Sequence, residues 1–285
     1  MEIPCKYSGR KKPTRKKTRF RFRLFLGYSG MIRDIKEETT MAQAIRNCFE
    51  RYEKKYLLTP AEKDLLLGEM RPYLTADEYG KYTILNTYYD TDDFLLIRES
   101  LEKPVYKEKL RIRSYAVPAK DGTVFAELKK KYCGVVYKRR ITLRADEVEP
   151  FLSGRYPDGA FGQIGREIGW FQSFYHTTPK AFIGYDREAY AGTHDPELRI
   201  TFDSCLRGRS ENVFLTAGDY GTPILPADRI LMEIKLPGVC PLWLSSLLSK
   251  AKIFGTSFSK YGTFYQQEIL PAKNPNIKKE AFLCA

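Results

Sequence analysis

The sequence lacks most of the short motifs by which enzymes are recognised. Its 6 cysteines form no C-x-x-C pair, and its 2 histidines, His176 and His194, are far from any of them in the sequence. A zinc site or a disulfide framework is therefore not expected, and the reducing cytoplasm is the expected location. No Walker loop, Rossmann glycine pattern, kinase signature or Ser/His/Asp set is present. Any bound phosphate would be held by side chains and not by backbone amides.

Long apolar runs are also missing. The stretch Leu242–Leu248 is interrupted by serines and is far too short to span a bilayer, so no transmembrane segment is expected. A composition of 43% hydrophobic and 29% charged residues, with 20 Tyr and 17 Phe, is that of a folded chain rich in strand-forming residues.

The net charge of +13 is unevenly distributed, because most of it lies in residues 1–40. We expect 1–40 to be a basic, disordered tail, 41–270 to be one folded domain and 271–285 to be a C-terminal tail. Met31 and Met41 are alternative starts. Since the folded part is only mildly basic, its charge does not indicate a nucleic-acid partner.

The elements predict a β-dominated α+β fold in which an antiparallel sheet carries peripheral helices. Thr59, Pro60 and Glu62 predict a capped helix that ends near Arg71. Closely spaced strands with short glycine-containing connections favour a meander, and closure into a barrel would remove its edges. The expected strands are 51–58, 82–90, 105–115, 123–132, 135–143, 181–190, 197–203, 212–216 and 229–236; further helices are expected at 94–101, 144–152, 162–174, 241–253 and 257–269.

The stretch Tyr106–Tyr115, YKEKLRIRSY, has cations at alternate positions. As a strand it would present Lys107, Lys109, Arg111 and Arg113 on one face, at intervals of about 6.6–6.8 Å. Such a row repels itself unless an anion lies along it. A solvated edge strand, protected from aggregation by its lysines, would explain this strand equally well.

Other expected strands repeat the pattern. Their polar faces carry mainly Lys and Arg, and the few carboxylates recur at E-x-K spacing in Glu53/Lys55, Glu127/Lys129 and Glu233/Lys235. A charged face turned to water would explain each strand alone. The strands taken together are better explained if these faces line a cationic interior. Buried unpaired charges cost several kcal/mol each, and a polyanion with a divalent cation would compensate them.

The carboxylates distinguish between classes of partner. A nucleic-acid groove combines cations with aromatic platforms and gains nothing from glutamates that point at phosphates. A polyphosphate bridged by Mg²⁺ or Mn²⁺ does use them, because the metal takes carboxylate and phosphate oxygens together while arginines bind the remaining oxygens. The pattern therefore favours a metal-bound polyphosphate over nucleic acid.

Motifs in a fixed order resemble those of a known family. ERYEKKYLL, KLRIRSY, ELKKKYCGVVYKRR, YDREAY with LRITFD, ILMEIK and SFSKYG follow the order seen in the catalytic domain of the vacuolar transporter chaperone (VTC) complex and its bacterial relatives. These proteins are triphosphate tunnel metalloenzymes of the CYTH-like superfamily. The resemblance spans residues 49–267.

The resemblance implies a closed eight-stranded antiparallel β tunnel that binds triphosphate and uses Mn²⁺ or Mg²⁺. In the eukaryotic polymerase, the ATP γ-phosphate is transferred to a growing inorganic polyphosphate chain and ADP is released. Carried over by motif, the phosphate path would be lined by Lys55, Arg111, Arg113, Lys129, Lys138, Arg187, Arg199 and Lys260, with Glu233 on the metal. Strand facing adds Glu53, Lys109, Arg140 and Lys235 as substrate-binding residues and Glu127 as a metal ligand.

Alternatives stay open at this point. Related tunnel enzymes hydrolyse tripolyphosphate or make cyclic AMP, and a non-catalytic polyphosphate-binding module would need the same cations. Ser257 stands where the polymerase has a second lysine, so the acceptor side of the tunnel could differ. Neither an SPX domain nor a membrane segment is seen in this sequence, and it leaves open a membrane-protein partner and the oligomeric state.

Overall fold

A computed structural model describes residues 52–133, 135–157 and 159–274. All of these lie in one of two compact units of the chain, Arg46–Ala285. The expected basic tail, 1–40, and residues 275–285 of the expected C-terminal tail lie outside the described residues. Residues 271–273 of that tail belong to a short helix.

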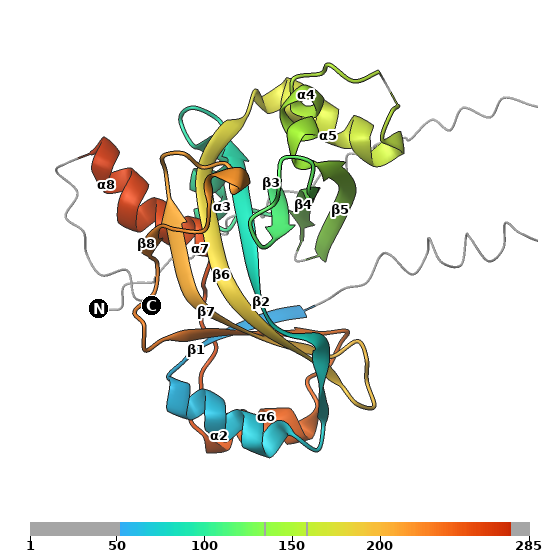
Figure 1. The fold of residues 1–285 in the computed structure, drawn as a ribbon. Helices are drawn as coiled ribbons and strands as arrows, with labels where there is room; N and C mark the ends of the chain where they lie inside the picture. Colours follow the sequence, from blue (N-terminus) through green and yellow to red (C-terminus); the bar gives the residue numbers. More distant parts are fainter. Residues whose placement is uncertain (1–51, 134, 158, 275–285) are drawn as a thin grey trace, which may run out of the picture. The chain divides into compact units, whose positions relative to one another are not determined.

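A 9-stranded antiparallel sheet dominates the described part, in agreement with the predicted fold class (Figure 1). Its order is β1-β9-β7-β6-β2-β3-β4-β5, and β8 pairs only with β7. The strands are β1 (Tyr52–Leu58), β2 (Leu74–Asp90), β3 (Tyr106–Tyr115), β4 (Thr123–Tyr132), β5 (Val135–Arg144), β6 (Thr178–Gly192), β7 (Arg199–Arg209), β8 (Thr222–Pro223) and β9 (Ile230–Leu236).

The sheet is open, so the predicted closed tunnel is not confirmed. Within the described residues, no ladder joins the two end strands, since β1 pairs only with β9 and β5 only with β4. A side-chain contact joins one end strand to the neighbour of the other instead, because Lys129 Nζ on β4 lies 3.6 Å from Glu53 Oε2 on β1. The sheet therefore curls far enough to bring the charged faces of β1 and β4 together without closing its backbone hydrogen bonds.

Helices cover both faces of the sheet. They are α2 (Pro60–Met70), α3 (Leu95–Leu101), α4 (Val148–Leu152), α5 (Gly162–Tyr175), α6 (Leu242–Lys250), α7 (Lys260–Phe264) and α8 (Leu270–Lys273), with a π-helical stretch at Tyr265–Ile269 between the last two. None of the described helices combines the length and the apolar character needed to cross a bilayer.

Three apolar clusters join these helices to the sheet. Helices α4 and α5 pack on the outer face of β3–β5, where Leu110, Leu128 and Phe171 are buried together. Helices α2 and α6 lie side by side and cover β1, β7 and β9 (Figure 1). Helices α3 and α7 pack around Tyr88 and Tyr261 in the remaining cluster. Since each fully buried apolar side chain contributes about 1.5–3 kcal/mol, the clusters fix the sheet between its helices.

Helix α2 begins as the sequence predicts. The Thr59 Oγ1 accepts a hydrogen bond from the Glu62 amide at 3.2 Å, and Glu62 Oε2 accepts one from the Thr59 amide at 2.7 Å. Pro60 occupies the first turn, where its missing N–H is not needed. The capping box is therefore confirmed.

Two local predictions need correction. The strand expected at 82–90 begins earlier, because β2 starts at Leu74 and its first residues pair with β6. Residues 212–216 are not a strand, because Arg209 donates hydrogen bonds to the carbonyls of Asn212 and Phe214 and holds the segment as a loop around its guanidinium. In both places a partner distant in the sequence, or a buried cation, outweighs local propensity.

Asp90 is a fully buried carboxylate that fixes the start of α3. It accepts hydrogen bonds from the amides of Leu96 and Ile97 at 2.9 and 3.0 Å and from the Tyr261 hydroxyl at 3.1 Å. We expect Asp90→Ala to lower the free energy of unfolding by about 2–4 kcal/mol, because buried donors lose a charged acceptor. Urea unfolding followed by circular dichroism measures this change.

Asp92→Ala is the matched control for this prediction. Asp92 lies two residues away and pairs with Lys180, but its side chain is 90% exposed. Its removal should have a much smaller effect, since exposed ion pairs contribute little to stability. Equal losses in the two variants would show that Asp90 does not anchor α3.

Candidate functional site

The alternating cations of β3, β4 and β5 lie on one face of the sheet, which we call the cationic face. The ladders align Arg113 with Phe125, Arg111 with Glu127 and Arg140, and Lys109 with Lys129 and Lys138. Directly aligned residues of an antiparallel pair point to the same side. The strand-facing argument made from the sequence is therefore confirmed for these three strands.

Glu127 is the centre of one group on this face. Its side chain is 1% exposed and accepts from Arg111, Lys138 and Arg140 at 2.8, 2.7 and 2.6 Å. Arg113 Nε lies 3.8 Å from the same carboxylate. Burial alone would raise the pKa of Glu127, but Arg111, Arg113 and Lys138 hold it well below its usual range. The carboxylate thus stays charged and aligns cations from β3 and β5.

A second group joins β1 and β9. Lys55 Nζ lies 3.3 Å from Glu53 Oε1 and 3.4 Å from Glu233 Oε1, and it donates to the Phe258 carbonyl at 2.9 Å. Burial would raise the pKa of Glu53, but Lys129, Lys55 and Lys235 outweigh it and lower this pKa to about 2. Two carboxylates therefore share one lysine on the cationic face.

Asp203, which sequence reasoning did not identify, is the centre of a third group. It is fully buried and accepts from Arg187 at 2.6 and 2.8 Å through both of its oxygens. Lys260, the first residue of α7, lies 2.6 Å from Asp203 Oδ2 and 2.8 Å from Glu233 Oε1. Asp203 therefore joins a cation from β6 to one from α7. Because Arg199, Thr201 and Asp203 alternate along β7, strand facing could have revealed it.

Two tyrosines also lie among the cations. Arg113 donates to the Tyr185 hydroxyl at 3.3 Å, and Lys260 Nζ lies 4.6 Å from the centre of the Tyr185 ring. Arg111 donates to the Tyr88 hydroxyl at 3.2 Å. These residues were also missed from the sequence, where tyrosine indicates only strand propensity. They connect the β3 cations to those of β6 and α7.

Arg199 and Ser257 lie at the margin of the site, whereas Lys235 lies close enough to Glu233 and Glu53 for their charges to act on its pKa. Lys235 lies on β9 beside Glu53 of β1 in the ladder. Arg199 is exposed and pairs with Asp77 at 3.2 Å, so the structure does not bring it into the three groups. Ser257 is exposed near the Lys55 contact and adds no charge there.

The carboxylates differ in how well they fit a divalent cation. Within the part of the chain that the structure describes, no group of three or more His, Cys, Asp or Glu side chains is arranged to hold a metal ion. Mg²⁺ commonly takes only one or two carboxylates and completes its shell with phosphate and water oxygens. Glu233 and Glu53, joined through Lys55, fit that role. Glu127 fits it less well, since three cations lie within 2.8 Å of its oxygens. Only Lys260 lies that close to Glu233, whose contacts with Lys55 and Arg187 are 3.4 and 3.6 Å long.

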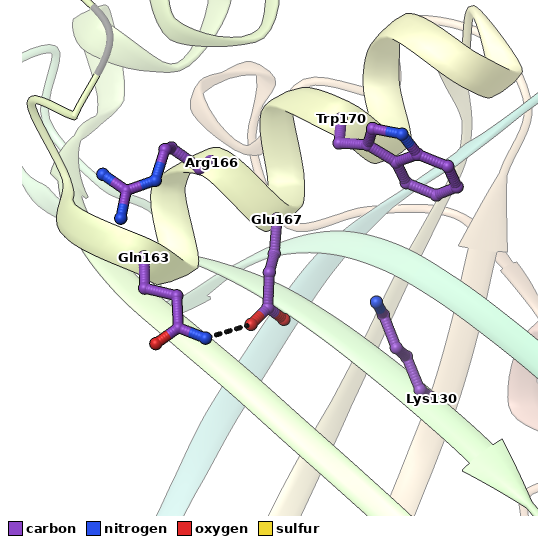
Figure 2. A pocket seen from close by; sticks show the side chains of 5 residues that line it. All are labelled: Lys130, Gln163, Arg166, Glu167 and Trp170. Atoms are coloured by element: carbon purple, nitrogen blue, oxygen red, sulfur yellow. Dashed lines mark hydrogen bonds between the residues drawn. The ribbon is translucent and has the colours of Figure 1, made fainter. Parts of the chain in front are cut away.

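A surface hollow of about 380 Å³ lies on the other side of the sheet (Figure 2). It is lined by Lys130, Gln163, Arg166, Glu167 and Trp170, and Gln163 donates to Glu167 at 3.4 Å. Lys130 alternates with Lys129 and Lys131 along β4 and therefore points away from the cationic face. The hollow is separate from the three groups.

Comparisons with known proteins identify a family. Residues 50–268 match the model of the family described as "VTC domain". A search of curated proteins finds no match.

Three of the solved structures that match this chain are described as other kinds of protein. A candidate adenylate cyclase from Bacillus halodurans is 16% identical, with a TM-score of 0.44 over 73% of this chain and 92% of that one. Another from Vibrio parahaemolyticus is 11% identical, with a TM-score of 0.42 over 76% and 98%. The Mimivirus capping enzyme triphosphatase is 10% identical, with a TM-score of 0.32 over 78% and 98%. These scores are low, so the family assignment rests on the family model.

Replacing Asp203 distinguishes between two roles for this carboxylate, neutralising charge and orienting cations, because the two roles predict opposite changes in polyanion affinity. If Asp203 only neutralises charge, Asp203→Asn should strengthen the binding of a polyanion. We expect it to weaken the binding of tripolyphosphate about tenfold, because Arg187 and Lys260 lose the carboxylate that orients them. Calorimetric titration without metal measures this affinity.

Glu188→Gln is the control for the Asp203 variant. It removes a carboxylate that pairs with Lys63 on the other face of the sheet, at 2.6 Å. This variant should bind tripolyphosphate nearly as the unaltered chain does. Tighter binding by Asp203→Asn would refute the orienting role.

Proposed function

The chain belongs to the VTC domain family, and we propose that it is an ATP-dependent inorganic polyphosphate polymerase. It would transfer the γ-phosphate of ATP to a growing polyphosphate chain on the cationic face. One observation carries this proposal: cations from several strands and from α7 converge on one face, where buried carboxylates orient them. Such a set suits a polyanion far better than a neutral substrate.

The proposed reaction is an in-line displacement. A terminal oxygen of the acceptor chain attacks the γ-phosphorus of ATP, the bond to the β–γ bridging oxygen breaks, and ADP leaves with that oxygen. Phosphoryl transfer depends mainly on positioning and on stabilising the charge of the transferred group. Arg111 and Arg113 on one strand, with Arg187 and Lys260 across the face, are the residues that we assign to this task. Tyr185 lies between these two pairs of cations and supports their arrangement.

Glu233 and Glu53 would hold the divalent cation, Mn²⁺ or Mg²⁺. When bound, the metal would neutralise part of the phosphate charge. Lys55 lies between both carboxylates and would be free to pair with phosphate if they turned toward a metal. Lys138 and Arg140 stay ordered by Glu127 in either case. ATP as the donor suits the cytoplasmic location that we propose from the cysteine usage.

Incubation with ATP and Mn²⁺ tests this function. We expect ADP and long polyphosphate, with its middle-phosphate signals in ³¹P nuclear magnetic resonance. Arg111→Ala/Arg113→Ala should lower kcat/KM at least about 100-fold, since two donors to the transferred group are lost. The single variant Arg111→Met should also lower kcat/KM.

Arg155→Ala is the matched control, because it removes an arginine whose side chain is 61% exposed, away from the cationic face. It should keep full activity. Orthophosphate as the sole phosphorus product would indicate a hydrolase, and tight binding without turnover would indicate a binding module. Either result would refute the polymerase.

A further inference from the structure

A block of lysines extends the cationic face beyond its arginines. Lys107 and Lys109 on β3 lie directly opposite Lys131 and Lys129 on β4. We call these residues the lysine cluster. Like charges directly opposite each other destabilise a sheet. The cluster is therefore unfavourable for the fold unless an anion lies over it.

The lysine cluster differs from the arginine rows in how its charge is compensated. Arg111 and Arg113 share Glu127, whereas within the described residues neither Lys109 nor Lys131 forms an ion pair with a carboxylate. Lys107 donates to the Ser100 carbonyl at 3.0 Å, and Lys129 approaches Glu53 at 3.6 Å. Most of the positive charge in the cluster is thus left without a counter-charge from the chain.

The titration of Lys109 agrees with this arrangement. Burial, together with the neighbouring Lys107 and Lys129, lowers the pKa of Lys109 to about 7. The pKa of Lys107 is lowered in the same way. A bound anion would favour the charged forms of these lysines and would raise their pKa values again. The cluster is therefore expected to bind anions.

We propose that the lysine cluster is a second anion subsite, which holds the acceptor polyphosphate chain next to the donor triphosphate. This inference rests on the proposed polymerase, and it names where the second substrate binds. Lys107 lies two rows beyond Arg111, about 13 Å along β3. A triphosphate centred on Arg111 and Arg113 would not cover these lysines. They could therefore bind a second stretch of phosphates. A hydrolase needs only water as acceptor and has no use for such a subsite.

Binding measurements with two probes test the subsite. The probes are tripolyphosphate and long-chain inorganic polyphosphate, titrated into the full chain without metal or nucleotide. We expect Lys109→Met/Lys131→Met to weaken the binding of long polyphosphate at least about tenfold. Tripolyphosphate affinity should change less than about threefold, because the short probe is held at the arginine rows.

Lys81→Met/Lys120→Met is the control, because it removes the same charge from two exposed lysines outside the cationic face. It should affect both probes little. An equal loss for both probes in the cluster variant would show a general electrostatic effect and would overturn the subsite. Unchanged binding of long polyphosphate would overturn it as well. Since no turnover is measured, a failure to make polymer would refute the polymerase and leave this comparison intact.

Thermal unfolding gives an independent readout. Without an anion, Lys109→Met/Lys131→Met should raise the melting temperature, because it relieves repulsion between opposite lysines. Long polyphosphate should then stabilise the variant less than the unaltered chain. A lower melting temperature in the variant would mean that the lysines serve the fold, and would overturn the proposal.

Discussion

Buried carboxylates that hold cations on one face of the sheet are the constraint on which the site depends. Glu127 and Asp203, 1% and 0% exposed, each align cations from more than one element. A single buried charge is very unfavourable, but a carboxylate surrounded by guanidinium and ammonium groups is stable and fixes their directions. The arginines are therefore positioned before any anion arrives, which reduces the ordering that binding requires.

The apolar clusters supply the rigidity for this arrangement. Each charged strand has an apolar reverse side that packs on helices, as Leu110 and Leu128 do beneath α5. Helix α7 packs on Tyr88 through Tyr261, with ring centres 4.8 Å apart, and so carries Lys260 to Asp203 and Glu233. Sites held on packed strands and helices are more precise than sites on loops. The same sequence alternation thus builds both the core and the cationic face.

Much of this organisation could be predicted from the sequence, because alternation is a local property. It placed Arg111, Glu127 and Arg140 on one face, and the Thr59–Glu62 pattern gave the start of α2. Long-range features were not predictable in this way. Closure of the sheet depends on pairing between β1 and β5, which no local pattern encodes. The loop at 212–216 depends on Arg209, and the role of Asp203 depends on Lys260, more than fifty residues further along the chain. From the sequence alone, Tyr185 indicates only strand propensity, and its role among the cations becomes visible only in the fold.

A crystal structure of the chain with tripolyphosphate tests the central claim most directly, since the claim is that the cationic face is built around a polyanion. We predict density for the phosphates within hydrogen-bonding distance of Arg111, Arg113, Arg187 and Lys260, with Glu127 and Asp203 still paired to their cations. Phosphates bound instead at the outer hollow beside Lys130 and Arg166, with the cationic face empty, would contradict the account.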